Sequence, residues 1–180
     1  MAYHHGDLRR TLLDAAVEVI AESGPAAVSL RELARRAGVS HAAPAHHFGD
    51  KAGLMTALAA EGFGLLADEL AAAPDLQESG VAYIRFATRN RAHFEVMFRA
   101  ELYHADDPQV AAAATRAADI LAEHVAGQVG EADRHAARLA AWSLVHGFAA
   151  LWLGGALPSD VGTDPEAAAR PVLKLLFDGR

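Results

Sequence analysis

The residues whose types and spacing indicate the clearest chemistry in this sequence lie between Ser29 and Lys51. The segment combines basic side chains with three histidines, His41, His46 and His47. Imidazole, guanidinium and ammonium groups all donate hydrogen bonds to base edges or phosphate oxygens. Hydrogen bonding to a nucleic acid is therefore the chemistry that this segment predicts.

A metal site is the alternative interpretation of the same histidines. Adjacent residues of a helix point about 100° apart, so His46 and His47 are poorly placed to share one ion. His41 stands about a turn and a half away along a helix. No carboxylate lies at ligand spacing, and the chain has no cysteine. We therefore expect neither a metal ion nor a cofactor.

Local signals divide the segment into two short helices joined by a turn. Ser29 and Glu32 have the spacing of a capping box, in which each side chain bonds the other residue's backbone N–H. Gly38 can adopt the left-handed conformation that ends the first helix, and Ser40 can cap a second helix that begins at His41. The apolar face of the first helix consists of Leu30, Leu33, Ala34 and Ala37. This order predicts a helix-turn-helix, whose second helix enters the major groove of DNA.

The rest of the chain also has helical periodicity. An apolar stripe from Leu8 to Ile20 predicts a helix before the motif, and Asp50 is expected to cap a long helix that runs to about Ala73. Alanine dominates the composition and β-branched residues are few, which favours helices throughout. Breaks between the later helices are expected at Pro74-Asp75, Asp107-Pro108, Gly127 to Gly130, and Asp164-Pro165. We predict an all-α fold with a three-helix domain at residues 1–50 and a larger helical domain at residues 51–180.

Charge is divided unevenly along the chain. Residues 1–55 hold six Lys or Arg and six Asp or Glu, so the whole net charge of −7 comes from residues 56–180. We call the predicted DNA-binding domain, residues 1–50, the reader. A reader with little net charge can still place its lysines and arginines near phosphates. Its affinity for DNA should then depend strongly on salt. The N-terminus has no apolar segment of the signal-peptide type, and no run of about 18 apolar residues lacks charges or glycines. We therefore expect a cytoplasmic protein without membrane insertion.

Around the predicted helix-turn-helix, the chain resembles the tetracycline-repressor (TetR) family of transcriptional regulators. The matching residues are Leu12 to Ile20, Glu22-Ser23-Gly24, Ser29 to Ala34, Ala37 to Ser40, His47-Phe48 and Asp50-Lys51. This resemblance covers about the first 60 residues and is weaker beyond them. A finer resemblance, to TetR-like regulators with a C-terminal domain of the WHG type, depends on His4 to Arg9, Ser40 to Pro44, and Trp142 with His146-Gly147.

The resemblance implies a homodimer that binds a pseudo-palindromic operator in double-stranded DNA. The implied DNA-contacting residues are Arg9, Arg31, Ser40, His41, Ala42, Ala43, Ala45, His46, His47 and Lys51. Pro44 and Phe48 are expected to face inward. Most relatives carry Tyr where this chain has Ala45, and losing its hydrogen bond to a phosphate should weaken binding by about 1 kcal/mol.

The resemblance also implies a ligand cavity among the later helices and a dimer interface formed by the last two long helices. The residues expected around the cavity are Tyr83, Phe86, His93, Phe94, Met97, Phe98, Tyr103, Trp142 and His146. Ordinary core packing is the alternative for each of them, because Met and aromatic residues at helical spacing are more often core than pocket. His93 and His146 are either hydrogen-bonded core histidines or polar groups that orient a mostly apolar ligand.

The sequence therefore predicts a DNA-binding transcriptional regulator that a small, largely apolar molecule releases from its operator. We expect repression rather than activation only because repression is usual in the family that the chain resembles. An enzyme is one alternative, but the chain has no Cys nucleophile, G-x-S-x-G, G-x-G-x-x-G or P-loop. The other alternative is a dimeric ligand-binding or adaptor module with weak or lost DNA binding. Three features keep this second alternative open. They are Ala45, the scarcity of Lys and Arg in the second helix of the motif, and the acidic composition of residues 56–180.

Overall fold

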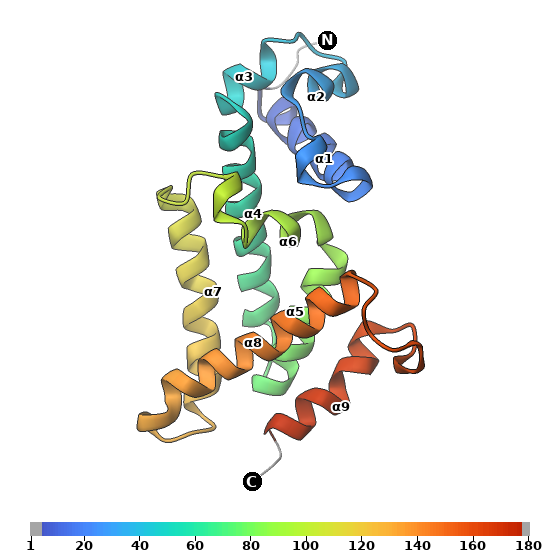
Figure 1. The fold of residues 1–180 in the computed structure, drawn as a ribbon. Helices are drawn as coiled ribbons and strands as arrows, with labels where there is room; N and C mark the ends of the chain where they lie inside the picture. Colours follow the sequence, from blue (N-terminus) through green and yellow to red (C-terminus); the bar gives the residue numbers. More distant parts are fainter. Residues whose placement is uncertain (1–4, 178–180) are drawn as a thin grey trace. The chain divides into compact units, whose positions relative to one another are not determined.

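The structure is a computed structural model that describes residues 5–177, apart from the side chains of residues 5–7 and 176–177. Every regular element in this range is helical, which confirms the predicted all-α fold. The α-helices are α1 (His5–Ser23), α2 (Leu30–Ala37), α3 (Ala43–Phe48), α4 (Lys51–Ala71), α5 (Leu76–Arg89), α6 (Arg91–Met97), α7 (Pro108–Ala126), α8 (Arg134–Leu153) and α9 (Pro165–Phe177) (Figure 1). Short 3₁₀ helices lie at Pro25–Ala27, Ala100–Leu102, Glu131–Asp133 and Ser159–Val161.

The contacts within the chain define two compact units. Unit 1 consists of Met1–Gly62 and Ala92–Ala112, and unit 2 consists of Phe63–Arg91 and Ala113–Arg180. Helices α4 and α7 therefore contribute to both units. This division by contacts differs from the functional boundary expected between residues 50 and 51, which stays a prediction.

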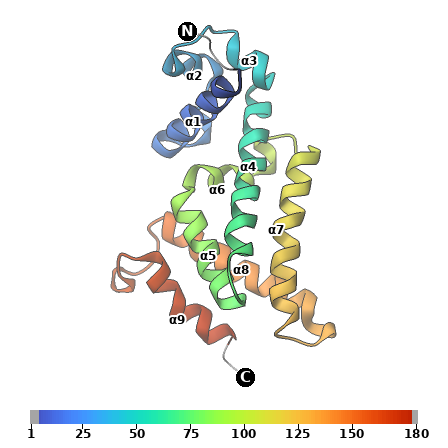
Figure 2. The same cartoon turned by 180° about the vertical axis from the view of Figure 1, so that it is seen from behind.

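Unit 1 contains the predicted helix-turn-helix. Helix α1 packs against α2 and α3, and α2 packs against α3. Both ribbon views show α3 leading directly into α4 (Figure 1, Figure 2). The most deeply buried side chains that these four helices contribute to unit 1 include Leu12, Ala16, Ile20, Leu33, Ala34, Leu54, Met55, Leu58 and Ala59. They recur at helical spacing, so the apolar stripes expected from the sequence form the core of this unit.

Gly62 allows α6 to approach α4 closely within unit 1. A Cβ atom on Gly62 would lie 3.1 Å from Cβ of His93 and 3.1 Å from Sδ of Met97. Such separations are tighter than ordinary contacts, so a larger residue would push the two helices apart. Gly62 thus has a packing role between α4 and α6.

Helix α5 is the centre of unit 2. It packs against both α8 and α9, and the two ribbon views agree on this arrangement (Figure 1, Figure 2). A Cβ atom on Gly80 of α5 would lie 2.7 Å from Cδ2 of Leu173 on α9. Leu173 is only 1% exposed, so it fills the space that the glycine leaves. This contact fixes the depth at which α9 sits on α5.

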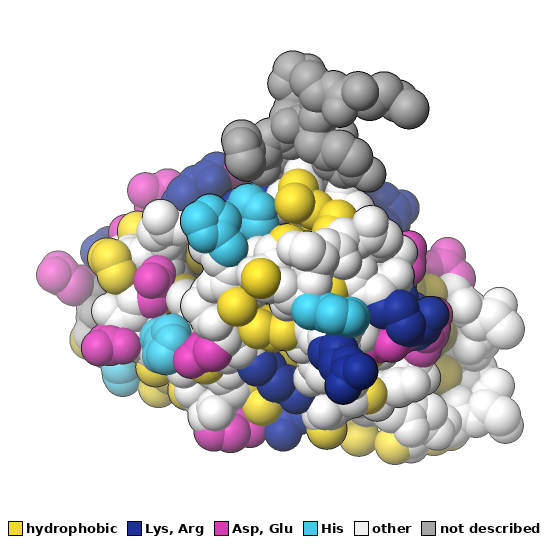
Figure 3. Space-filling view, turned by 90° about the horizontal axis from the view of Figure 1, so that it is seen from above, with side chains coloured by type: hydrophobic (Ala, Val, Ile, Leu, Met, Phe, Trp, Pro, Cys, Tyr) yellow, Lys and Arg dark blue, Asp and Glu magenta, His cyan; other side chains and the backbone are white. Residues whose placement is uncertain are grey.

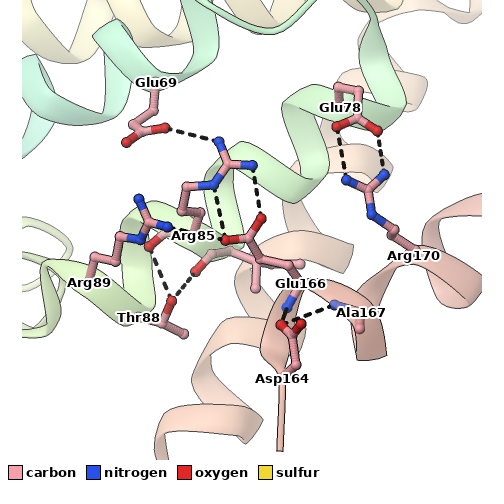
Figure 4. Close-up of polar contacts among 10 residues, drawn as sticks. Glu69, Glu78, Arg85, Thr88, Arg89, Asp164, Glu166, Ala167 and Arg170 are labelled. Atoms are coloured by element: carbon pink, nitrogen blue, oxygen red, sulfur yellow. Dashed lines mark hydrogen bonds and ion pairs between the residues drawn. The ribbon is translucent and has the colours of Figure 1, made fainter.

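Two groups of ion pairs also hold α9 on α5 (Figure 4). Arg85 of α5 donates to both carboxylate oxygens of Glu166, over 3.0 and 2.8 Å, and to Glu69 of α4 over 3.4 Å. The hydrogen bonds from Arg85 lower the pKa of Glu166. Arg170 of α9 binds both oxygens of Glu78 on α5 in the same way. The α5–α9 contact is thus an apolar centre with paired charges around it.

Three helix starts confirm the caps expected from the sequence. The side chain of Asp50 accepts the N–H of Gly53 at the start of α4, over 2.8 Å. Asp107 and Asp164 accept backbone N–H groups at the starts of α7 and α9. In both later helices a proline follows the cap, where its missing N–H leaves no donor unpaired.

Candidate functional site

Helix α2 begins at the Ser29 cap and ends at Gly38, as the sequence predicts. Oγ of Ser29 accepts the N–H of Glu32 over 3.2 Å at the start of α2. Gly38 ends the helix in the left-handed conformation, with a φ of 66°. The N–H of Val39 bonds the carbonyl of Ala34 over 3.0 Å. This closing pattern satisfies the last carbonyls of α2 and sets the direction in which the chain enters α3.

The start of α3 differs from the prediction. The helix begins at Ala43 rather than His41, and Ser40 does not cap it. Its N-cap residue is Ala42, which makes no hydrogen bond through its side chain. Pro44 lies in the first turn, where its fixed backbone angle suits a helix N-terminus and removes one N–H that a cap would have to satisfy. Ser40 and His41 are therefore exposed turn residues that precede the helix.

The face predicted to read DNA is open to solvent. Exposed residues on it are Arg31, Ser40, His41, Ala42, Ala45 and His46, and half-buried ones are Ala43, His47 and Lys51. Pro44 is buried, as predicted, and Phe48 is half-buried. Figure 3 shows histidines and apolar side chains on this face among a few lysines and arginines. The side chains therefore offer hydrogen bonds and methyl groups with little permanent charge.

Two of the cations expected at phosphates also make contacts within unit 1. The guanidinium of Arg9 lies 5.3 Å from the centre of the Phe48 ring, which is a cation–π arrangement. Nζ of Lys51 donates to the carbonyl of Ala26 over 3.0 Å. Both groups keep further donors for a phosphate. Their internal contacts nevertheless hold them close to the protein surface.

The two arginines at the end of α2 are paired with carboxylates. Arg35 donates two hydrogen bonds to Glu32, over 2.8 and 2.7 Å. Arg36 binds Glu32 over 3.1 Å and Glu22 of α1 over 2.9 Å. Hydrogen bonds from Arg35 and then from Arg36 lower the pKa of Glu32 to about 2. The hydrogen bond from Arg36 lowers the pKa of Glu22. These two arginines thus bring little net positive charge to the reader.

Sequence reasoning missed a polar contact that joins α1, α4 and α6 within unit 1. Nη1 of Arg10 donates to Oε1 of Glu61 over 2.7 Å, and Nε2 of His93 lies 3.5 Å from the same oxygen. His93 is 5% exposed, and neither of its ring nitrogens has a hydrogen-bond partner among the described residues. The interaction with His93, followed by the hydrogen bond from Arg10, lowers the pKa of Glu61 to about 2. No local pattern could reveal this contact, because its members lie far apart in the sequence.

The residues expected around a ligand belong to both units. His93, Phe94, Met97, Phe98 and Tyr103 lie in unit 1, whereas Tyr83, Phe86, Trp142 and His146 lie in unit 2. In unit 1, the rings of Phe94 and Phe98 meet edge to face at 5.5 Å, and the hydroxyl of Tyr103 donates to the carbonyl of Met97 over 2.9 Å. Within unit 1, Phe94 therefore contacts Phe98, and Tyr103 contacts Met97.

Three of the unit 2 residues form a polar cluster. The hydroxyl of Tyr83 lies 2.9 Å from Nδ1 of His146, and the ring of Trp142 lies 6.0 Å from the imidazole. Burial raises the pKa of Tyr83 and lowers the pKa of His146, which keeps both groups neutral near pH 7. With the phenol as donor, the imidazole carries its proton on Nε2. Phe86 is fully buried and belongs to the core.

Large apolar side chains of α8 and α9 face solvent. They are Leu139, Trp142, Leu151, Val172 and Leu175, which are 37% to 81% exposed. Among the described residues one segment, Glu131–Leu153, is long and apolar enough to span a membrane, with 17% of the tested window buried. This is weak evidence for a span, because length and composition are its only basis. A helix covered by another protein chain meets the same criteria.

Two family models match the chain. The model described as "Bacterial regulatory proteins, tetR family" matches residues 12–58. The model described as "Tetracyclin repressor-like, C-terminal domain" matches residues 76–176, which is more than half of the chain. The finer resemblance to the WHG type is not tested by these matches and stays a prediction.

Individual relatives agree with these models. The HTH-type transcriptional regulator BetI of Rhizobium meliloti (strain 1021) is 45% identical over 65 residues, which are 36% of this chain and 32% of that protein. The match thus spans about a third of the relative's length. A solved structure of a protein of unknown function from Rhodococcus sp. RHA1 is 33% identical, with a TM-score of 0.81, and the match covers 99% of this chain and 98% of that one. A tetR-family regulatory protein from Rhodococcus RHA1 is 26% identical over 95% of each chain, with a TM-score of 0.74.

Proposed function

Because the chain belongs to the TetR family, which consists of transcriptional regulators and not of enzymes, we propose that it is a ligand-responsive DNA-binding regulator. It acts in the cytoplasm as a homodimer on a pseudo-palindromic operator. It represses its target genes until a small, largely apolar molecule releases it from DNA.

The observation that carries the proposal is helix α3, which follows the turn at Gly38 and exposes Ala45 and His46 to solvent. The turn holds α3 against α1 and α2, so that its outer side chains are free to enter the major groove. His41 and His46 supply hydrogen bonds to base edges, and Ala methyl groups can contact the methyl group of thymine. The remaining cations of the reader contact phosphates, which position the helix without reading sequence.

A dimer through α8 and α9 is supported by the apolar side chains that these helices expose. Leu151 is 48% exposed and Leu175 is 81% exposed. Several exposed large apolar side chains on two helices are what a contact with another chain would cover. A symmetric dimer would hold two copies of α3 about 34–36 Å apart, which is one turn of DNA.

The response to a ligand is supported by polar groups that lie within mostly apolar surroundings. The Tyr83–His146 pair in unit 2 is one such group, with the ring of Trp142 beside the imidazole. A few polar groups in an apolar site are what orients a small ligand. Ligand binding favours a conformation in which the two copies of α3 are not spaced to fit the operator. The free energy of this shift cannot exceed the difference between the ligand's binding free energies for the two conformations.

The alternative is a dimeric ligand-binding or adaptor module with weak or lost DNA binding. It is favoured by Ala45, which cannot make the phosphate contact of the usual Tyr, and by the absence of Lys and Arg from α3. The ion pairs of Arg35 and Arg36 add to this argument, because they reduce the positive charge available to DNA.

Binding of the purified protein to the DNA that flanks its own gene separates the two proposals. The assay is run at two salt concentrations with unrelated competitor DNA present. The regulator predicts tight binding that resists competitor and weakens steeply with salt. Binding no tighter than to the competitor would favour the adaptor module instead.

A further inference from the structure

Helix α3 carries no lysine or arginine, so its surface charge depends on its histidines. The helix holds His46 and His47, and His41 precedes it in the exposed turn. His41 and His46 are exposed, and His47 is half-buried. The rings of His46 and His47 lie 5.6 Å apart, so two titratable groups occupy one small area of the surface.

Part of the permanent positive charge around α3 is neutralised or held against the protein surface. Arg35 and Arg36 share the two carboxylates of Glu22 and Glu32, so this group of four has no net charge. Arg9 lies over the ring of Phe48, which keeps it close to the protein surface.

The elements that pack against α3 are α1 and α2. The charged groups that they and the start of α4 bring to this region are Arg9 and Glu22 on α1, Arg31, Glu32, Arg35 and Arg36 on α2, and Asp50 and Lys51 beside α3. Each of these carboxylates has its own partner, because Glu22 and Glu32 bind arginines and Asp50 caps α4. Among these described groups, Asp50 keeps a negative charge beside the end of α3, and DNA phosphates would supply further counter-charge for protonated histidines.

We propose that this reader takes up protons on His41, His46 and His47 when it binds DNA, so that its affinity for DNA rises as the pH falls. The inference rests on the proposed DNA-binding function and adds a regulatory property to the same surface. Histidine is the side chain whose ordinary titration lies between pH 5 and 8. DNA phosphates favour the charged form of a nearby imidazole, because opposite charges stabilise each other.

The sign and the size of the effect follow from proton linkage. If the complex holds more protons than the free partners, lower pH stabilises the complex. Each histidine that gains a full proton on binding raises the affinity by up to tenfold per pH unit. Each new positive contact with a phosphate also makes the slope of log affinity against log salt steeper by about 0.9.

The test measures affinity by fluorescence anisotropy at about pH 6 and about pH 8, each over a range of salt concentrations. The probes are a labelled duplex from the DNA flanking the gene and an unrelated duplex. The expected result is an affinity at least about tenfold higher at the lower pH for both probes, with a salt slope steeper by about 1 to 2. Circular dichroism at both pH values checks that the helices stay folded.

Variants identify the histidines responsible. The triple variant His41→Gln, His46→Gln, His47→Gln should lose most of the ratio between the two affinities. His46→Arg supplies a permanent charge and should reduce the ratio by raising the affinity at the higher pH. His104→Gln is the matched control, because His104 is exposed in the segment before α7, outside α3 and outside the proposed dimer helices, and should leave the ratio unchanged.

The outcomes separate this inference from the function on which it rests. Binding that is equally tight at both pH values, or a triple variant that keeps the full ratio, would overturn the inference alone. No binding to either duplex at either pH, even at low salt, would overturn the proposed function and the inference with it.

Discussion

Arginine–glutamate pairs on α2 and between α5 and α9 have different consequences. On α2 the pair of Arg35 and Glu32 joins residues three positions apart, and the side chain of Arg35 is 69% exposed. Between α5 and α9, the side chains of Arg85 and Glu166 are 28% and 26% exposed and come from distant parts of the sequence. Exposed local pairs add little stability, whereas a partly buried pair costs more when one member is removed. Arginine–glutamate pairs thus reduce the net positive charge of the reader on α2 and hold α9 against α5 in unit 2.

The largest expected effect comes from the packing behind the α5–α9 ion pairs. Leu173→Ala should lower the free energy of unfolding by about 3 kcal/mol, because it empties a fully buried site against Gly80. Urea unfolding of the dissociated chain measures this loss.

The matched control is Leu175→Ala on the same helix. Leu175 is 81% exposed, so this variant should change the unfolding of the dissociated chain by less than about 0.5 kcal/mol and weaken self-association instead. Equal effects of the two variants on unfolding would contradict the assigned contact between α5 and α9.

Glu61 of α4 extends the comparison to a carboxylate whose pKa is lowered first by His93 of α6 and then by Arg10 of α1. Its pKa of about 2 in the folded protein lies below that of an unfolded glutamate, so it stabilises the fold above about pH 4.3. This contribution, about 2 kcal/mol after solvent screening, should be lost as the pH falls from about 5 toward 2. Unfolding at a series of pH values should show a smaller acid-induced loss for Glu61→Gln than for the natural chain. An unchanged acid profile would remove these contacts of Glu61 from the account.

Arg85→Gln and Arg35→Gln test the comparison between the two regions directly. Arg85→Gln should lower the free energy of unfolding by about 1 kcal/mol, because it removes the cation that Glu69 and Glu166 share and leaves Glu166 the longer contact with Arg89. Arg35→Gln should leave the urea midpoint unchanged within error, since its pair with Glu32 is local and exposed. A larger loss from Arg35→Gln than from Arg85→Gln would reverse the comparison.

The smallest change concerns charge alone. Glu22→Gln should not alter unfolding measurably, but it releases the guanidinium of Arg36 from one of its carboxylates. Affinity for DNA should then rise by about twofold to tenfold, with a salt slope steeper by about 1. Binding titrations at several salt concentrations measure both quantities, and an unchanged slope would show that Arg36 does not reach a phosphate.

The features of this fold that depend on near neighbours in the chain could be predicted from the sequence. The cap at Ser29, the left-handed Gly38 and the caps at Asp50 and Asp107 are local, because each side chain bonds a backbone group within a few residues. The start of α3 was not predicted correctly, because Pro44 allows a helix to begin without the cap expected from Ser40.

Contacts between distant residues could not be predicted in this way. Nothing near Gly80 in the sequence indicates that Leu173 fills its space, and nothing near Arg10 points to Glu61. The individual DNA-contacting and ligand-contacting residues remain predictions for the same reason, since they depend on molecules outside the chain.

A footprint on the DNA that flanks the gene tests the central claim most directly. The account predicts two protected half-sites related by pseudo-twofold symmetry and about one DNA turn apart, because a homodimer presents two copies of α3. His46→Gln should weaken protection of both half-sites together. No protection at concentrations that saturate nonspecific DNA, or a single half-site without symmetry, would contradict the claim that this chain is a dimeric DNA reader.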